Sequence, residues 1–150
     1  MKHLKFGLLL AALGTVLSVA PAAFAQESSR AYTEGNVVVV SYIRTEPGKF
    51  DDYMSYLATT YKALMADYKA AGIILDYAVY ANQPVNEHDP DLILTITYKN
   101  LAALDNLDAR TDPIAKKVWS SLQASNQASA ERGKVRTVLG GRMLRQLNLK

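Results

Sequence analysis

Side chains that could support catalysis are few, and the densest group surrounds a histidine near the middle of the chain. Residues 86–91 have the sequence NEHDPD and place His88 among three carboxylates. These side chain types bind metals, but one imidazole beside adjacent carboxylates lacks the ligand spacing of a metal centre. Polar segments between strands are usually exposed loops. We therefore expect a solvated loop here, with no metal site and no general base at His88.

A second group consists of aromatic and hydroxyl side chains at the predicted strands and second helix. They predict a pocket in which flat apolar molecules stack and phenol groups orient them. The alternative is that these rings are core or subunit interface. Nine tyrosines against three phenylalanines favour a wet cavity, because a buried phenol needs a hydrogen-bond partner. The candidate ligand-binding residues are Ser41, Tyr42, Tyr80, Thr97, Tyr98 and Trp119.

The charged residues within predicted strands each allow two interpretations. In a cavity, Asp76 would have a pKa raised by desolvation and would be the candidate catalytic proton acceptor. At a sheet edge it would only hinder pairing with another strand, and we favour this second interpretation. Near the last strand, Arg136, Arg142 and Arg145 could bind an acidic ligand. Pairing with acids of the first helix, or exposure to solvent, is the interpretation we favour for them.

The strands that would position these residues have a clear pattern. Residues 37–43 and 92–98 are rich in β-branched side chains and apolar in both phases, which predicts central strands covered on both faces. Residues 73–81 alternate, which predicts a strand with one more polar face. Residues 135–147 form the last predicted strand, in which Gly140 and Gly141 mark a bulge or bend.

Two helical regions separate these strands. The first begins at Phe50, repeats its apolar residues in steps of three and four, and ends at Gly72. The second begins after Asn100, a good N-terminal cap, and ends at Gly133. Within it, Asp112 and Pro113 predict a restart of the helix. Its predicted buried stripe is Ile114, Val118 and Leu122.

Two strand-helix-strand units in series predict a fold of the α+β class, a ferredoxin-like βαββαβ arrangement with an antiparallel sheet. Right-handed crossovers place the first and third strands at its centre. Both helices cover the same face, so the other face would expose an apolar patch larger than a soluble monomer usually carries. We therefore expect a homodimer formed face to face.

A family resemblance in element order and turn chemistry is carried by the segments VVVVSYIRTEPGKFDDYMSYL and LILTITYKNLAALDNL. In the first, a strand meets Pro-Gly and a long helix, and in the second, the third strand runs into a helix. They resemble the dimeric α+β barrel superfamily. Its members include cofactor-free monooxygenases of antibiotic biosynthesis, haem-degrading enzymes and many small proteins with no assigned reaction. The resemblance implies a barrel formed by two copies of the chain.

The resemblance does not extend to the haem-degrading site. Those relatives use an asparagine in the first strand, a tryptophan near the end of the third and a histidine in the second helix. This chain has Ser41 and Tyr98 at the strand positions, and residues 114–122 contain Trp119 but no histidine. We therefore expect no haem and no other bound cofactor.

Residues 1–25 have the layout of a secretory signal peptide. Two lysines precede an apolar run, and Ala23-Phe24-Ala25 matches the small-x-small cleavage pattern. Cleavage would leave a flexible leader at residues 26–36, a domain at residues 37–150 and a periplasmic or secreted product. The chain has no cysteine, and without the signal it is almost neutral. We therefore expect no disulfide, no nucleic-acid partner and no membrane attachment after cleavage.

Three functions remain open. The first is an exported dimer that binds a small hydrophobic or aromatic molecule between sheet and helices. The second is a cofactor-independent monooxygenase or isomerase, in which Tyr98, Trp119 and Asp76 orient and deprotonate an aromatic substrate. The third is a purely structural or interaction dimer with a filled cavity. An open cavity separates the first two from the third.

Overall fold

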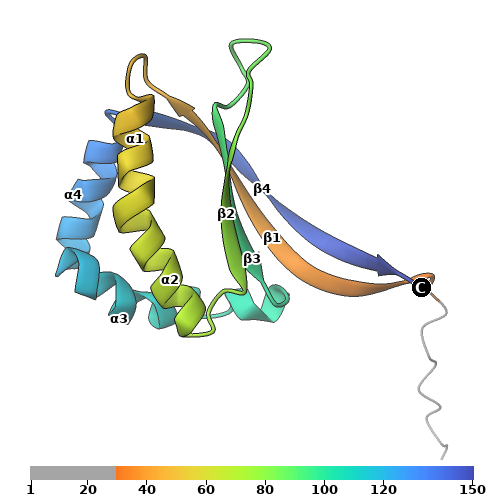
Figure 1. Ribbon diagram of the computed structural model, residues 1–150. Helices are drawn as coiled ribbons and strands as arrows, with labels where there is room; N and C mark the ends of the chain where they lie inside the picture. Colours follow the sequence, from red (N-terminus) through yellow and green to blue (C-terminus); the bar gives the residue numbers. More distant parts are fainter. Residues whose placement is uncertain (1–29) are drawn as a thin grey trace, which may run out of the picture.

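A four-stranded antiparallel sheet with the strand order β2-β3-β1-β4 carries a layer of helices on one face (Figure 1). This computed structural model describes residues 30–150, so the predicted signal peptide and residues 26–29 lie outside the described residues. The elements are β1 (Tyr32–Thr45), α1 (Phe50–Tyr56), η1 (Leu57–Tyr61), α2 (Lys62–Ala70), β2 (Asp76–Ala81), β3 (Leu92–Tyr98), η2 (Leu101–Leu104), α3 (Leu107–Trp119), α4 (Leu122–Arg132) and β4 (Arg136–Leu149).

The ferredoxin-like α+β fold predicted from the sequence is confirmed. The first and third strands, β1 and β3, are the central pair, and their register runs from Val37 opposite Tyr98 to Ile43 opposite Leu92. β2 lies at one edge and β4 at the other. The two doubly apolar sequences therefore occupy the two positions that have a strand on each side, as the crossover rule requires.

β1 begins earlier than predicted, inside the proposed leader 26–36. Tyr32 pairs with Leu149 and Glu34 with Leu147, so β1 and β4 continue together as a two-stranded ribbon beyond the helices (Figure 1). An ion pair of 2.8 Å between Glu34 and Arg145 links the two strands. Polar residues 32–36 form strand because the ladder with β4 satisfies their backbone groups, which a hydrophobic pattern does not reveal.

The first predicted helix is present, but it contains a π-helical turn. This turn, η1, lies between α1 and α2 and accommodates one more residue than an α-helical turn. The buried side therefore departs from the regular steps of three and four. Tyr53 and Met65 are buried, whereas Phe50 is exposed. The helix faces the sheet with a different set of side chains at each of its two ends.

The second helical region differs from its prediction. α3 runs through Pro113 without a restart, because Leu107 and Ile114 pack against the core on either side of it. The break comes at Ser120, which has a left-handed backbone, and Ser121 then caps α4 by accepting a hydrogen bond from the Ala124 amide at 3.1 Å. This turn leaves two predicted stripe residues exposed, Val118 and Leu122. The predicted cap at Asn100 and the stop at Gly133 are confirmed.

The core between the two layers consists of two clusters. The first contains Val37, Leu64, Met65, Ile73, Ile74 and Tyr98, and the second contains Ile43, Tyr53, Leu57, Leu92 and Leu94. Tyr61 packs against both clusters. It therefore lies at the junction of the two halves of the core.

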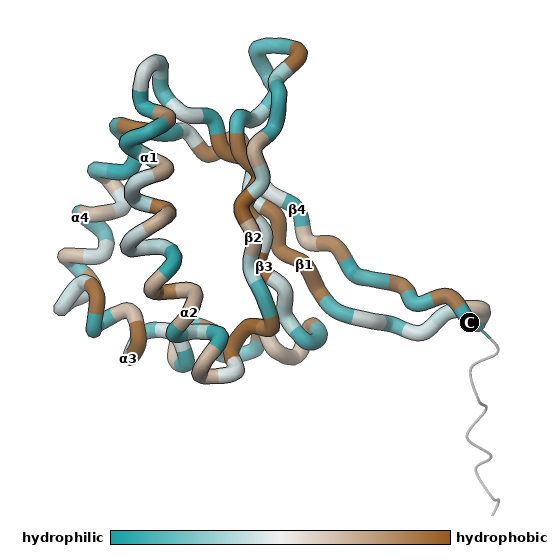
Figure 2. Tube along the Cα trace, viewed as in Figure 1, coloured by the Kyte–Doolittle hydropathy of each residue, from teal (hydrophilic) through white to brown (hydrophobic). Residues whose placement is uncertain are grey.

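The sheet face opposite the helices is uncovered. Strand side chains alternate between faces, so Val38, Val40 and Tyr42 point away from the helices when Val37 and Ile43 point toward them. Among the exposed apolar residues, Tyr80 and Leu144 belong to this face through the strand register. Figure 2 shows that apolar segments continue along the β1–β4 ribbon.

The predicted bulge in the last strand is confirmed. The register of β4 against β1 shifts between Tyr42, which pairs with Gly140, and Ile43, which pairs with Val138. Beside this bulge the strands approach closely. A Cβ atom on Gly141 would lie 2.5 Å from the carbonyl oxygen of Val40.

Replacing Gly141 with alanine should therefore force β4 away from β1. We expect Gly141→Ala to lower the free energy of unfolding by about 2–3 kcal/mol, as overpacking against fixed backbone does. Gly48→Ala is the control, because a Cβ there meets no atom and only the positive φ of +72° is unfavourable. Its cost should be about 1 kcal/mol. Urea denaturation measures both values, and equal costs would contradict this account of the bulge.

Candidate functional site

A cavity of about 190 Å³ lies between the sheet and the helix layer. The sheet supplies Ser41, Ile43, Leu94, Arg136 and Val138, and the helices supply Tyr53, Tyr56, Tyr61 and Arg132. A second hollow, at the turn between α3 and α4, holds only about 50 Å³. The larger cavity is therefore the candidate site among the described residues.

The aromatic wall of this cavity comes from one face of the first helix. Tyr53 and Tyr56 lie three residues apart on α1 and stack with their ring centres 5.8 Å apart. Tyr61 is the last residue of the π-helical turn, and its ring meets that of Tyr77 edge to face at 5.9 Å. The π-helical turn therefore separates the stacked pair from the third ring.

The two arginines of the cavity come from either side of a short connection. Arg132 ends α4 and Arg136 begins β4. The amide of Glu46 donates a 3.0 Å hydrogen bond to the Val135 carbonyl, which fixes the connection to the end of β1. Both guanidinium groups are therefore delivered to the same end of the helix layer.

Each guanidinium lies over aromatic rings. The central carbon of Arg132 is 5.0 Å from the ring centre of Tyr56 and 5.9 Å from that of Trp119. The corresponding carbon of Arg136 is 5.6 Å from the ring centre of Tyr53. These distances are in the range of cation–π attraction. The rings hold the arginines in place without neutralising their charge.

Two residues that line this cavity each have a polar side-chain atom that is buried without a hydrogen-bond partner. They are the Tyr61 hydroxyl and the Nε of Arg136, and within residues 30–150 no other side-chain atom is in this condition. A buried polar group without a partner costs about 1–3 kcal/mol. Native proteins leave few such groups, so both atoms mark a place where the packing beside the cavity reduces stability.

Two phenol groups of the cavity, those of Tyr53 and Tyr61, are kept neutral near pH 7 by a raised pKa. Burial raises the pKa of Tyr61 well above its ordinary value, and neighbouring tyrosines raise it further. Burial also raises the pKa of Tyr53, although the nearby Arg136 guanidinium opposes this shift. Neutral phenols donate and accept hydrogen bonds, so they orient a ligand rather than remove its proton.

The predicted ligand-binding residues do not come together. Ser41 lines the cavity, but its neighbour Tyr42 points to the opposite face of the sheet, where Thr97 and the 55% exposed Tyr80 also lie. Tyr98 is buried in the first core cluster, and Trp119 packs against that cluster. The core interpretation therefore applies to these two rings.

Asp76 lies on the edge strand β2, away from the cavity. Its carboxylate accepts a 2.8 Å hydrogen bond from the Lys69 ammonium, and this bond holds its pKa below the ordinary value. Its side chain is exposed. The structure therefore places Asp76 in the edge position that the sequence favoured.

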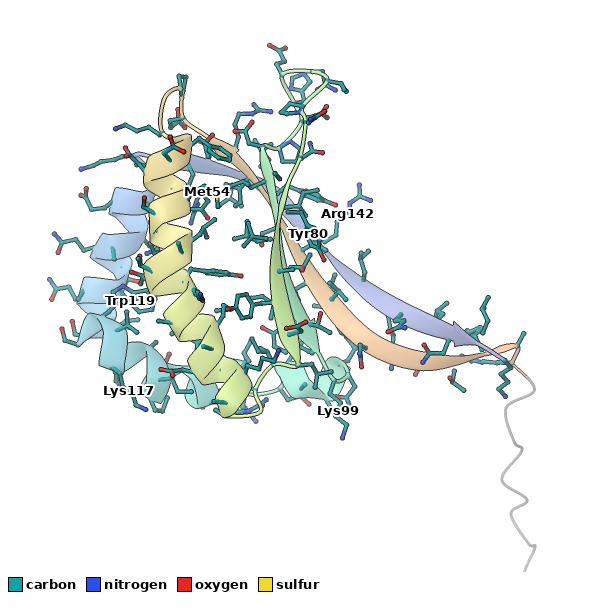
Figure 3. The ribbon with its side chains drawn as sticks, in the orientation of Figure 1. Met54, Tyr80, Lys99, Lys117, Trp119 and Arg142 are labelled. Carbon is teal, nitrogen blue, oxygen red and sulfur yellow. The ribbon has the colours of Figure 1, made fainter. Side chains whose placement is uncertain are left out.

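The three arginines of β4 have different surroundings. Arg136 lines the cavity. Arg145 pairs with Glu34, which is an acid of β1 rather than of the first helix. Arg142 pairs in register with Val40 and points to the face opposite the helices (Figure 3).

The segment around His88 is a loop closed by its own side chains. The Asp91 carboxylate accepts 2.7 Å hydrogen bonds from both the amide and the hydroxyl of Thr45, and Asp89 accepts one of 2.9 Å from the Val85 amide. His88 is exposed. Residues 30–150 contain no group of three or more side chains placed to hold a metal ion. None of their helices is long and apolar enough to cross a membrane.

Besides the aliphatic residues Ile43, Leu94 and Val138, sequence reasoning missed four cavity residues, Tyr53, Tyr56, Tyr61 and Arg132. The three tyrosines lie within nine residues of one predicted helix, so their clustering was visible as a signal. No signal in the sequence indicated Arg132, because the position of this residue depends on the break at Ser120 that separates α4 from α3.

Comparison with known proteins supports the fold. No protein-family model matches the chain, and no curated protein sequence does either. Among solved structures, the chain is similar to HapK from Hahella chejuensis, with a TM-score of 0.50 and 12% sequence identity. The match covers 73% of this chain and 91% of HapK. At this identity the likeness concerns the arrangement of the backbone.

The unpartnered hydroxyl of Tyr61 should lower the free energy of unfolding of the ligand-free protein. We expect Tyr61→Phe to raise the free energy of unfolding of the ligand-free protein by about 1 kcal/mol. The ordinary phenol pKa is 10.0 and burial raises it in the folded state, so above pH 10 this group ionises first in the unfolded state, which lowers the free energy of unfolding. The variant should therefore lose less stability than the wild type above pH 10.

Urea denaturation at neutral and alkaline pH measures both effects. Tyr32→Phe is the control, because its hydroxyl is exposed at the start of β1 and removing it should change neither quantity. A Tyr61→Phe variant less stable than the wild type would show that the hydroxyl has a partner in solution.

Proposed function

We propose that this protein binds a small aromatic molecule in the cavity between its sheet and its helices. The carrying observation is the contrast between the two cavity walls, with tyrosine rings on the helix side and Ile43, Leu94 and Val138 on the sheet side. An apolar cavity of about 150 Å³ is enough to hold benzene. A volume of about 190 Å³ therefore suits one or two rings.

Binding is favoured over catalysis by the chemistry of the lining. No carboxylate or imidazole is among the side chains that line the cavity. The phenols are held neutral by burial, as the raised pKa of Tyr61 indicates. A general base for proton abstraction needs a group that accepts a proton near neutral pH. The oxygenase or isomerase alternative lacks such a group in this cavity, and a purely structural role leaves the open volume unexplained.

We also propose that the protein acts outside the cytoplasm as a homodimer. The export proposal rests on the signal-like residues 1–25. The dimer proposal rests on the uncovered sheet face, where Leu144 is 50% exposed and Tyr80 is 55% exposed. Pairing two such faces would remove this apolar surface from water. The ligand cavity lies on the other side of the sheet, so each copy would carry its own site.

The binding proposal predicts that filling the cavity abolishes binding. Ser41→Phe places a ring in the cavity from β1 and should weaken binding of a two-ring probe by at least about tenfold, which corresponds to 1.4 kcal/mol. Fluorescence titration with 2-naphthoate and its neutral analogue 2-naphthamide measures this. Thr33→Phe, on the exposed end of the same strand, is the control and should bind normally. If neither probe binds to the wild type, the proposal fails.

The dimer proposal predicts that a charge on the uncovered face separates the copies. Leu144→Asp should weaken the dimer by at least about tenfold, because it buries a carboxylate without a partner. Leu122→Asp is the control, since this residue is 69% exposed on α4, on the other side of the molecule. Sedimentation velocity over a range of concentrations gives the dissociation constants. A monomeric wild type would contradict the proposal.

A further inference from the structure

We propose that the occupant of the cavity is an aromatic anion, with its carboxylate bound by Arg132 and Arg136. This inference rests on the proposed binding function and adds the charge of the ligand. It follows from three features of the cavity: the number of positive charges, the absence of compensating acids and the apolar wall on the sheet side.

The cavity carries two positive charges and no negative one. Arg132 and Arg136 are its only ionisable residues besides the neutral tyrosines. Neither guanidinium forms an ion pair with any carboxylate of residues 30–150, whereas Arg145 on the same strand pairs with Glu34 at 2.8 Å. Both arginines are partly buried, and charges attract more strongly in such a site than in bulk water. A bound anion would therefore gain the attraction of both cations.

The arginines are held by aromatic rings rather than by carboxylates. The Arg132 guanidinium lies over the Tyr56 ring and the Arg136 guanidinium over the Tyr53 ring, both at cation–π distances. The Nε of Arg136 is buried and without a partner. Guanidinium edges match the two oxygens of a carboxylate, because five N–H donors lie in one plane. A carboxylate in the cavity would therefore bind at the guanidinium edges of Arg132 and Arg136 that line it, rather than at the enclosed Nε.

The rest of the cavity favours an aromatic body over a small inorganic anion. Phosphate or sulfate would leave the apolar wall of Ile43, Leu94 and Val138 unused. A flat ring would contact that wall and the tyrosine rings together. Charge and shape thus agree on one class of ligand.

The test compares two probes that have the same shape and different charge. We expect the wild type to bind 2-naphthoate at least about tenfold more tightly than 2-naphthamide, because the carboxylate accepts charge-assisted hydrogen bonds that the neutral amide does not. Arg136→Gln and Arg132→Gln should each reduce this preference, and the double variant should abolish it. Arg142→Gln is the control, because this arginine lies on the opposite face of the sheet and should leave the preference unchanged.

The outcomes separate the two proposals. Equal binding of both probes by the wild type would overturn the anion inference and leave the binding function intact. Binding of neither probe would overturn both. Competition by inorganic phosphate as strong as that by naphthoate would show that the ring is not recognised. If Arg136→Gln does not fold, Arg136→Lys retains the charge without the planar donors and should show a smaller loss of preference.

Discussion

The alternation of side chains along β1 is the constraint on which the rest of the structure depends. β1 is paired on both sides and covered by helices on one face only. Each side chain of β1 therefore points either to the helix side or to the open side. Because Val37 points to the helix side, the direction of every side chain that follows it, up to the bulge, is fixed. That single phase decides that Ser41 meets the cavity, and it leaves Tyr42 to the opposite face.

The cavity is the space between sheet and helices that the side chains of the helix layer do not fill. Two apolar clusters pack the two halves of the interface, and Tyr61 lies at their junction with its hydroxyl unsatisfied. An ordinary core would place an aliphatic residue at this junction. Keeping a phenol and two uncompensated guanidinium groups here lowers the stability of the empty protein. Groups of this kind are typical of sites in which stability is reduced in favour of binding.

The fold could be predicted because its signals are local and repeated. Residues 92–98 are apolar in both phases, and this alone places the strand at the centre of the sheet. The site could not be predicted in the same way. The predicted set included both members of the adjacent pairs Ser41–Tyr42 and Thr97–Tyr98, which cannot face one cavity. Arg132 reaches the cavity only because Ser120 ends α3, and a single left-handed serine has no strong sequence signal.

The π-helical turn of the first helix implies that the cavity wall can be moved by a change of chain length. With one residue fewer, the turn at Leu57–Tyr61 would become regular α-helix, and the part that precedes it would rotate by about 100° relative to the part that follows. Tyr53 and Tyr56 would leave the cavity, while Leu64 and Met65 would keep their places in the core. Insertions and deletions at this turn would therefore alter the wall of the candidate site while preserving the fold.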